Sequence, residues 1–249
     1  MTELFSIAGK TALVTGGSSG IGAAIASAYR KAGAKVAITT HSTPNSDHHQ
    51  HDQEGILTIQ AELSNPDTAE HVLAVFDREL GPIDILVNCA GTIRRGAAED
   101  FQKNDWNDVM AVNLNAVWHL SQLAGRSMLS RGSGKIINIA SLLSFQGGVR
   151  VPSYTASKHA VAGLTKALAN EWASRGVNVN AISPGYIATA NTQALREDET
   201  RNRQILERIP AARWGEAEDV AGAAIFLAAK ASNYIHGQVL VVDGGWLAR

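Results

Sequence analysis

Seven short runs of apolar, mostly β-branched residues alternate with longer segments of helical periodicity, and this alternation limits the possible folds more than any other feature of the chain. Each run is apolar on both faces, as strands are in a parallel sheet that helices cover on both sides. The sequence therefore predicts the α/β class, with a doubly wound, Rossmann-type sheet of seven parallel strands in a single domain over residues 1–249. The predicted strands are Thr11–Thr15, Lys35–Thr39, Ile56–Gln60, Ile83–Asn88, Lys135–Ala140, Val177–Ile182 and Val239–Val242.

The segments between these runs differ in how regular they are. Helical spacing predicts helices over Ile21–Ala32, Pro66–Leu80, Asp105–Ser130, Tyr154–Arg175 and Glu218–Ala229. Thr40–Glu54 is polar and histidine-rich without apolar periodicity, so we expect an exposed loop there and no metal site, since metal ligands need fixed positions. Gly185–Ile209 includes the charged amphipathic run Leu195–Arg208, which makes residues 186–209 a candidate lid over the carboxyl ends of the strands.

Composition narrows the classes of partner and compartment. The chain has 249 residues, a formal net charge of −1 and one cysteine, Cys89. A nearly neutral chain gives no indication of a surface for nucleic acid or anionic membrane. One cysteine excludes an internal disulfide and suits a reducing compartment. The chain lacks the pattern of a signal peptide or a membrane span, so we expect a cytoplasmic protein that binds neither nucleic acid nor membrane.

A glycine-rich turn follows the first predicted strand and leads directly into a helix. Glycines at this point allow the tight turn and let the main chain approach a pyrophosphate, which then meets the positive end of the helix. The position of the turn, between the first strand and the first helix, predicts a dinucleotide site. Its expected ligands are Gly16, Ser18, Ser19, Gly20, Ile21 and Gly22.

The residues that end the second strand bear on the choice between NAD and NADP. A carboxylate there would bind both ribose hydroxyls, whereas an arginine would bind a 2′-phosphate. The strand ends Thr39-Thr40-His41-Ser42, with neither. Because this strand end has no arginine or lysine to neutralise a phosphate dianion, the sequence favours NAD and leaves NADP open.

Tyr154 and Lys158 are four residues apart on a predicted helix, hence neighbours on one face. Ser141 ends the strand before that helix. A free tyrosine is a poor base at neutral pH, but a nearby ammonium group and an oxidised nicotinamide ring both favour the phenolate. We therefore expect Tyr154 to exchange a proton with a substrate hydroxyl or carbonyl. Ser141 would bind the same oxygen, and Lys158 would lower the tyrosine pKa and reach the nicotinamide ribose.

These motifs together resemble the short-chain dehydrogenase/reductase family over essentially the whole chain. The segments that carry the resemblance are the spacing Gly16-x-x-x-Gly20-x-Gly22, Asn88-Cys89-Ala90-Gly91, Ser141 with Tyr154-x-x-x-Lys158, and Ser183-Pro184-Gly185. The resemblance implies that Asn113 holds a water for proton relay, with Asn115 as a nearby alternative. It also implies a homotetramer and further cofactor contacts at Thr40, Glu62, Leu63, Asn88, Ala90, Gly91, Tyr154, Lys158, Pro184, Gly185, Ile187 and Thr189.

Within that family, the loops that follow the strands are similar to those of the 2-dehydro-3-deoxy-D-gluconate 5-dehydrogenases, also called 2-deoxy-D-gluconate 3-dehydrogenases. The matching stretches include Gly91–Arg95, Leu143–Tyr154 and Pro184–Leu195. A sugar acid needs a carboxylate partner, for which arginine offers a bidentate fork. The candidates are Arg94 and Arg150 for the carboxylate, with Gln146, Tyr186 and Gln193 as further polar contacts.

Two other functions stay open at this point. The same chemistry would serve a 3-oxoacyl carrier-protein reductase or another polyol or gluconate dehydrogenase. A dinucleotide-sensing protein without catalysis would keep the fold, but it would not need Ser141, Tyr154 and Lys158 together.

Overall fold

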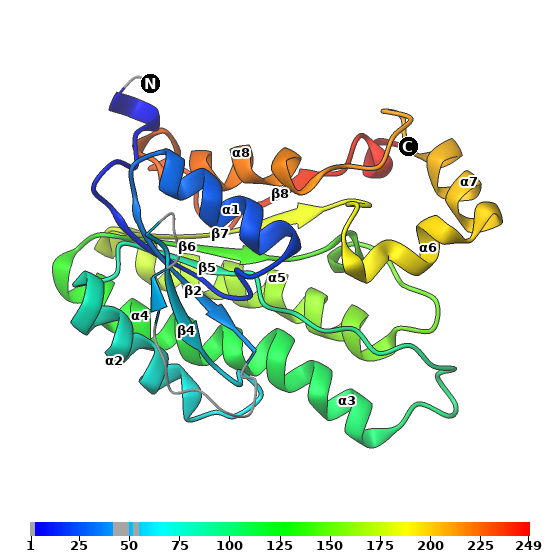
Figure 1. Cartoon of the computed structure of the whole chain (residues 1–249), viewed down its shortest axis with the longest axis horizontal. Helices are drawn as coiled ribbons and strands as arrows, with labels where there is room; N and C mark the ends of the chain where they lie inside the picture. Colours follow the sequence, from blue (N-terminus) through cyan, green and yellow to red (C-terminus); the bar gives the residue numbers. More distant parts are fainter. Residues whose placement is uncertain (1–2, 42–49, 52–54) are drawn as a thin grey trace.

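The computed structural model describes residues 3–41, 50–51 and 55–249, with the side chains of 50–51 left aside. One sheet runs through the molecule in the order β3-β4-β2-β1-β5-β6-β7-β8 (Figure 1). Its strands are β1 (Thr11–Val14), β2 (Lys35–Thr40), β3 (Gln50–His51), β4 (Leu57–Gln60), β5 (Ile85–Asn88), β6 (Gly134–Ile139), β7 (Val177–Pro184) and β8 (Val239–Val242). The seven predicted strands are present and pair in parallel, which confirms the predicted fold class.

The sheet has one strand that the sequence did not predict. The two-residue strand β3 pairs antiparallel with β4, with Gln50 opposite Thr58 and His51 opposite Leu57. It falls inside Thr40–Glu54, for which a loop was predicted, so that prediction was wrong at this point. Residues 42–49 and 52–54 of the predicted loop, including His48 and His49, lie outside the described residues.

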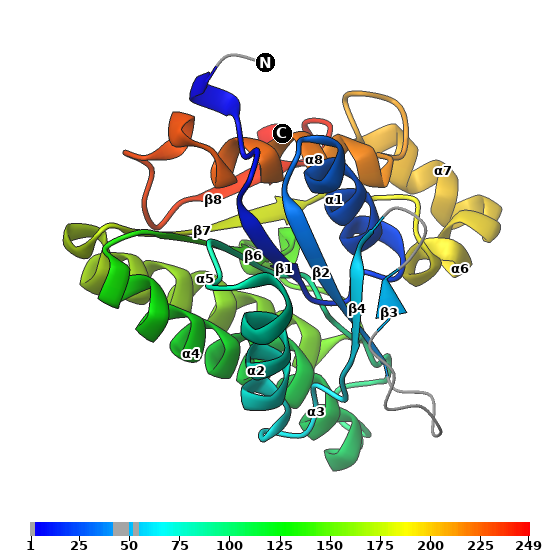
Figure 2. The same cartoon turned by 60° about the vertical axis from the view of Figure 1, so that its left-hand side comes forward.

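Helices cover both faces of the sheet (Figures 1 and 2). On one face lie α1 (Gly20–Lys31) and α8 (Ala217–Ala228), which contact each other closely. The other face carries α2 (Thr68–Leu80), α4 (Ala116–Arg131) and α5 (Pro152–Trp172), with α3 (Lys103–Met110) packed against α5. Each face has its own apolar core, and β1 contributes to both: Ala12 and Val14 pack on the α1 side, and Leu13 packs on the α2 side.

The contact between α1 and α8 joins residues far apart in the chain. Tyr29 of α1 is fully buried, and its hydroxyl donates a hydrogen bond of 2.9 Å to the carbonyl oxygen of Ala224 in α8. The same core includes Ile25 and Leu227. The first and the last long helix therefore share one apolar layer.

Two helical regions differ from the sequence prediction. The predicted helix Asp105–Ser130 is divided by a π-helical turn, Ala111–Asn115, between α3 and α4. Such a turn holds one extra residue and often marks a functional site. The candidate lid contains two short helices, α6 (Gln193–Glu197) and α7 (Glu199–Arg208). Within the described ranges, none of the helices has the length and apolar character that crossing a bilayer requires.

Candidate active site

The predicted cofactor residues lie at one edge of the sheet, where the parallel strands have their carboxyl ends. Gly16–Gly22 follows β1, Thr40 ends β2, and Glu62 and Leu63 follow β4; Asn88, Ala90 and Gly91 come at the end of β5, and Pro184, Gly185, Ile187 and Thr189 at the end of β7. This is the edge at which ligands bind in open α/β sheets.

The glycine loop is held against the end of β2. The backbone N–H of Gly16 donates to Thr39 Oγ1, and the N–H of Gly17 donates to the Thr39 carbonyl oxygen, both at 3.1 Å. Gly16 has a φ of +64°, and a Cβ at Gly22 would lie 2.3 Å from the Gly16 oxygen. Ser19, at the N-cap of α1, makes no side-chain capping bond. The first N–H groups of α1 therefore have no side-chain cap from Ser19, and uncapped N–H groups at a helix N-terminus are an arrangement that binds anions.

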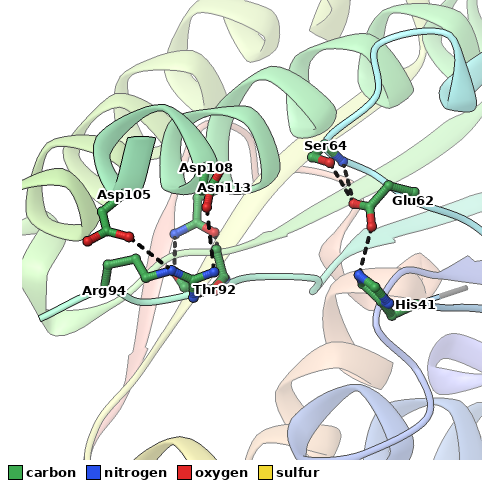
Figure 3. A network of polar contacts seen from close by, with 8 residues as sticks. All are labelled: His41, Glu62, Ser64, Thr92, Arg94, Asp105, Asp108 and Asn113. Carbon is green, nitrogen blue, oxygen red and sulfur yellow. Dashed lines mark hydrogen bonds and ion pairs between the residues drawn. The ribbon is translucent and has the colours of Figure 1, made fainter. Parts of the chain in front are cut away.

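A polar contact joins the residues that follow β2 and β4. His41 Nε2 lies 2.7 Å from Glu62 Oε2 (Figure 3). The other carboxylate oxygen accepts from the Ser64 hydroxyl at 2.7 Å and from its N–H at 3.1 Å. Hydrogen bonding from Ser64, with a smaller contribution from His41, holds the pKa of Glu62 below its usual range. The Glu62 side chain is therefore anionic at neutral pH.

Ser141, Tyr154 and Lys158 come together from β6 and α5. Ser141 lies two residues after the end of β6, and its Oγ accepts from the Leu143 N–H at 3.2 Å. The Lys158 ammonium lies 5.6 Å from the centre of the Tyr154 ring and donates a hydrogen bond of 2.7 Å to the Ile139 carbonyl oxygen. The structure thus places the three predicted catalytic residues beside one another.

Burial governs the proton affinities of this group. Burial raises the pKa of Tyr154, while hydrogen bonding with Ser141 and the positive charge of Arg95 act in the opposite direction. Burial also lowers the pKa of Lys158 to about 8. The sequence prediction named Lys158 as the cation that lowers the tyrosine pKa. The cation that acts on Tyr154 in this way in the structure is Arg95, which the sequence prediction did not select, and the role of Lys158 stays a prediction.

Asn113 lies in the π-helical turn and is fully buried. Its side-chain amide binds both main-chain groups of Thr92: Oδ1 accepts from the N–H at 2.8 Å, and Nδ2 donates to the carbonyl at 2.9 Å. Nδ2 also reaches the Ser157 hydroxyl at 3.3 Å, which in turn donates to the Tyr154 carbonyl oxygen. Asn115 is exposed. Asn113 therefore contacts α5, the helix that carries Tyr154, through Ser157.

The predicted substrate residues fall into two groups. Arg94 faces α3, where it lies 3.6 Å from both Asp105 and Asp108. Gln193 binds Glu197 within α6 at 2.7 Å. Arg150, in contrast, stands in the left-handed region with a φ of +62°, and its carbonyl accepts from the Gly96 N–H at 3.0 Å. Gln146 is half-buried in the same loop.

The sequence prediction chose Arg94, and not its neighbour Arg95, as a partner for the substrate carboxylate. Its Nη2 donates to the Asn191 carbonyl oxygen at 3.2 Å, so the side chain spans from the loop after β5 to the candidate lid. No periodicity in an irregular loop tells which of two adjacent arginines faces the site. The pair Asp105 and Asp108, three residues apart on a helix, was the available signal that Arg94 has partners elsewhere.

The candidate lid packs on aromatic side chains near the C-terminus. Tyr186 lies 4.6 Å from Trp246 and 5.5 Å from Trp214, measured between ring centres. Trp214 Nε1 donates to Asn202 of α7 at 2.7 Å, and Ile205 of α7 packs into the same apolar cluster. Packing against these two tryptophans therefore fixes the position of the Tyr186 ring.

Cys89 serves the packing beneath the cofactor edge. Its N–H and that of Ala90 both donate to Thr15 Oγ1 at 3.0 Å. Burial raises the pKa of the Cys89 thiol to about 12, so the group is a neutral thiol at physiological pH. Within the described residues, no group of three or more histidine, cysteine, aspartate or glutamate side chains is placed to hold a metal ion.

Known proteins resemble this chain over its full length. The family model described as enoyl-(acyl carrier protein) reductase matches residues 16–247. A 2-dehydro-3-deoxy-D-gluconate 5-dehydrogenase from Bacillus subtilis is 56% identical over 99% of this chain and 98% of its own length.

Solved structures agree in fold as well as in sequence. One, assigned provisionally as a 2-deoxy-D-gluconate 3-dehydrogenase from Agrobacterium tumefaciens with bound NADP, is 50% identical, with a TM-score of 0.90 over 100% of both chains. A gluconate 5-dehydrogenase from Burkholderia cenocepacia in complex with NADP and tartrate is 34% identical, with a TM-score of 0.90 over 99% of this chain and 98% of that one. With the glycine loop, the Ser141, Tyr154 and Lys158 cluster and the parallel sheet, these matches establish that the chain belongs to the short-chain dehydrogenase/reductase family.

Proposed function

We propose that the protein is an NAD(P)-dependent oxidoreductase that interconverts a hydroxyl and a ketone on a sugar acid such as 2-dehydro-3-deoxy-D-gluconate or 2-deoxy-D-gluconate. The observation that carries this proposal is the grouping around Tyr154: Ser141 hydrogen-bonds to it, the Lys158 ammonium lies 5.6 Å from the centre of its ring, and the charge of Arg95 acts on it. A cation for an acidic substrate would then stand near the proton-transfer groups. The names of the relatives point to the same substrate class.

The proposed chemistry assigns one step to each side chain. When bound, the nicotinamide ring supplies or accepts the hydride. In oxidation, the Tyr154 phenolate accepts the proton of the substrate hydroxyl, and in reduction the phenol returns a proton to the carbonyl oxygen. Ser141 donates a hydrogen bond to that oxygen and fixes its position. The Lys158 ammonium stabilises the phenolate, and Asn113 links the catalytic helix to the loop at Thr92.

The substrate carboxylate is proposed to bind near Arg95 and Arg150. These residues lie on adjacent loops, which are joined by the hydrogen bond from the Gly96 N–H to the Arg150 carbonyl. An arginine binds a carboxylate bidentately, which fixes both the position and the orientation of the acid. Gln146 and Tyr186 are the proposed hydroxyl partners, and residues 186–209 are the proposed lid.

Either dinucleotide is a candidate cofactor. The fixed charge of Glu62 disfavours a 2′-phosphate and supports NAD. The two solved relatives described above contain NADP.

The quaternary state and compartment proposed from the family resemblance are a cytoplasmic homotetramer. The exposed side chains of Trp106 and Trp118, on α3 and α4, are apolar surface that subunit contact would cover. Size-exclusion chromatography with light scattering tests the tetramer directly.

A carrier-protein reductase is the main alternative, and the description of the matching family model favours it. The deciding experiment follows NADH and NADPH absorbance with 2-dehydro-3-deoxygluconate, its 2,5-diketo form, 2-deoxygluconate, gluconate and an acetoacetyl thioester. We expect turnover of at least one sugar acid at a kcat/KM well above that of the thioester. Fast thioester reduction without any sugar-acid turnover would contradict the proposal and favour the alternative.

A further inference from the structure

Among the described residues, Arg94 contacts three side chains. Its Nη1 donates to Thr92 Oγ1 at 2.9 Å, while Nε and Nη2 each lie 3.6 Å from a carboxylate, on Asp105 and Asp108 (Figure 3). The two aspartates are three residues apart on α3 and so share one face of that helix. Two negative charges around one guanidinium leave the cluster with an excess of negative charge. A substrate carboxylate would be repelled there rather than bound.

The partner of Arg94 in the loop, Thr92, is fixed from the other side as well. The Asn113 amide binds both the N–H and the carbonyl of Thr92, as described above, and Asn113 continues to Ser157 and the Tyr154 carbonyl. A continuous polar chain therefore runs from α3 through the loop after β5 to the helix that carries Tyr154. Fully connected networks of this kind fix geometry more firmly than isolated bonds.

The orientation of Arg94 bears on the residue that follows it. Arg94 points to α3, whereas Arg95 points to the candidate lid, where it binds the Asn191 carbonyl oxygen. Arg94 and Arg95 are consecutive in the chain, so a change at Arg94 that lets the backbone rotate would also displace Arg95. Without Arg94, the Asn113 amide would still hold Thr92, but Thr92 lies two residues earlier in the chain, so this contact does not prevent the rotation at Arg94.

We propose that Arg94, held by Asp105 and Asp108, is a positioning residue that sets the loop Gly91–Gly96 so that Arg95 faces the substrate carboxylate. This inference rests on the function proposed above. It reverses the role that the sequence suggested for Arg94, from direct ligand to support. The carboxylate lies away from the reacting carbon, so it is held equally in the ground state and in the transition state. Loss of the support therefore raises KM and leaves kcat in place.

The test compares two changes that remove opposite ends of the same ion pairs. Arg94→Ala is expected to raise the KM for the sugar acid roughly tenfold, with kcat and the KM for the dinucleotide within about twofold of wild type. The double variant Asp105→Asn/Asp108→Asn is expected to raise KM in the same direction, and combining it with Arg94→Ala should add little. Arg78→Ala is the matched control, because Arg78 pairs with Glu79 at the far end of α2.

The aspartate variant separates support from direct binding. If Arg94 were itself the carboxylate ligand, neutralising Asp105 and Asp108 would free its guanidinium and lower KM or leave it unchanged, and either result would overturn the proposal. A parallel fall in kcat would do the same. Should Arg94→Ala fail to fold, the aspartate variant, on exposed positions of α3, carries the test alone.

Hydrogen exchange gives a readout that does not depend on turnover. The Thr92 N–H and the Gly96 N–H are both hydrogen-bonded in the structure, and both are expected to exchange faster in Arg94→Ala and in the aspartate variant than in Arg78→Ala. Unchanged exchange would contradict the positioning role. If wild-type protein turned over no sugar acid, the proposed function would fail, while the exchange comparison would still decide whether Arg94 sets the loop.

Discussion

The Lys158 ammonium lies 5.6 Å from the centre of the Tyr154 ring, one helical turn along α5, and is fixed there by its bond to the Ile139 carbonyl oxygen. Lys158 is 4% exposed, so its ammonium group has little contact with bulk water. The end of β6 therefore fixes the position of the Lys158 ammonium relative to the Tyr154 ring. The proton transfer proposed above depends on the protonation states of both residues.

Removing the tyrosine hydroxyl tests the proposed proton transfer. Tyr154→Phe is expected to lower kcat by about 10²–10⁴-fold, because the group that exchanges the proton is gone. Binding of NADPH, followed by fluorescence titration, should remain within about twofold of wild type, because the glycine loop is untouched. Turnover close to wild type would show that another group moves the proton.

The pH profile of turnover should reflect Lys158. Burial lowers its pKa from 10.5 to about 8, so the cation is complete well below that pH and is lost as the pH rises through it. We expect kcat to decline on the alkaline side as the phenolate loses its neighbouring charge. In Lys158→Arg the guanidinium stays charged, and the decline should move to higher pH.

A matched lysine serves as the control for that profile. Burial also lowers the pKa of Lys135 to about 8, but its Nζ binds Asn233 at the amino-terminal edge of the sheet, away from the site. Lys135→Met should leave the alkaline decline where it is. A decline that stayed in place in Lys158→Arg and moved in Lys135→Met would contradict the assignment.

The choice of dinucleotide should respond to Glu62. Its pKa is held low by Ser64 and His41, so the side chain is anionic at neutral pH and opposes a 2′-phosphate. Glu62→Gln is expected to raise the ratio of kcat/KM for NADPH over NADH by roughly tenfold. Glu79→Gln, which changes a glutamate at the end of α2, should leave the ratio unchanged. An unchanged ratio in Glu62→Gln would place the discrimination elsewhere.

Substituting alanine for each of two helical glycines, Gly22 and Gly222, should have opposite effects on the protein. A Cβ at Gly22 would lie 2.3 Å from the Gly16 oxygen, so Gly22→Ala must displace the glycine loop and abolish measurable dinucleotide binding. A Cβ at Gly222 in α8 meets nothing within 4 Å, and Gly222→Ala should raise the stability by about 0.5–1 kcal/mol. Calorimetry and cofactor titration on both variants check the pair. Normal binding by Gly22→Ala would mean that the loop is not a close-approach site.

The sequence predicted the sheet and the reacting residues because both depend on local patterns. Continuous apolar runs define parallel strands, and a strand end followed by a helix start defines where Ser141 and Tyr154 must lie. The π-helical turn at Ala111–Asn115 could not be read in the same way. Its residues have ordinary helical propensity, and the extra residue in the turn follows from how α3 and α4 pack rather than from their composition.

The contacts of residues in irregular loops were harder to predict from the sequence. Arg94 and Arg95 are chemically alike and adjacent, and what separates them is the position of Asp105 and Asp108 on a different element. Likewise, the residue that pairs with His41 is Glu62, at the end of another strand. The contact between His41 and Glu62 is set by the order of strands in the sheet, where β2 lies beside β4, and sequence spacing does not contain that order.

The hydrogen bond from Tyr29 to Ala224 has a consequence for how the chain is made. The apolar face of α1 is complete early in synthesis, yet the helix that covers it, α8, is among the last segments to emerge. Until then Ile25 and Tyr29 have no covering layer on that side, and the growing chain carries an exposed apolar stripe. Closure of the domain is therefore a late event, and a chain that stops before residue 217 should be prone to aggregation.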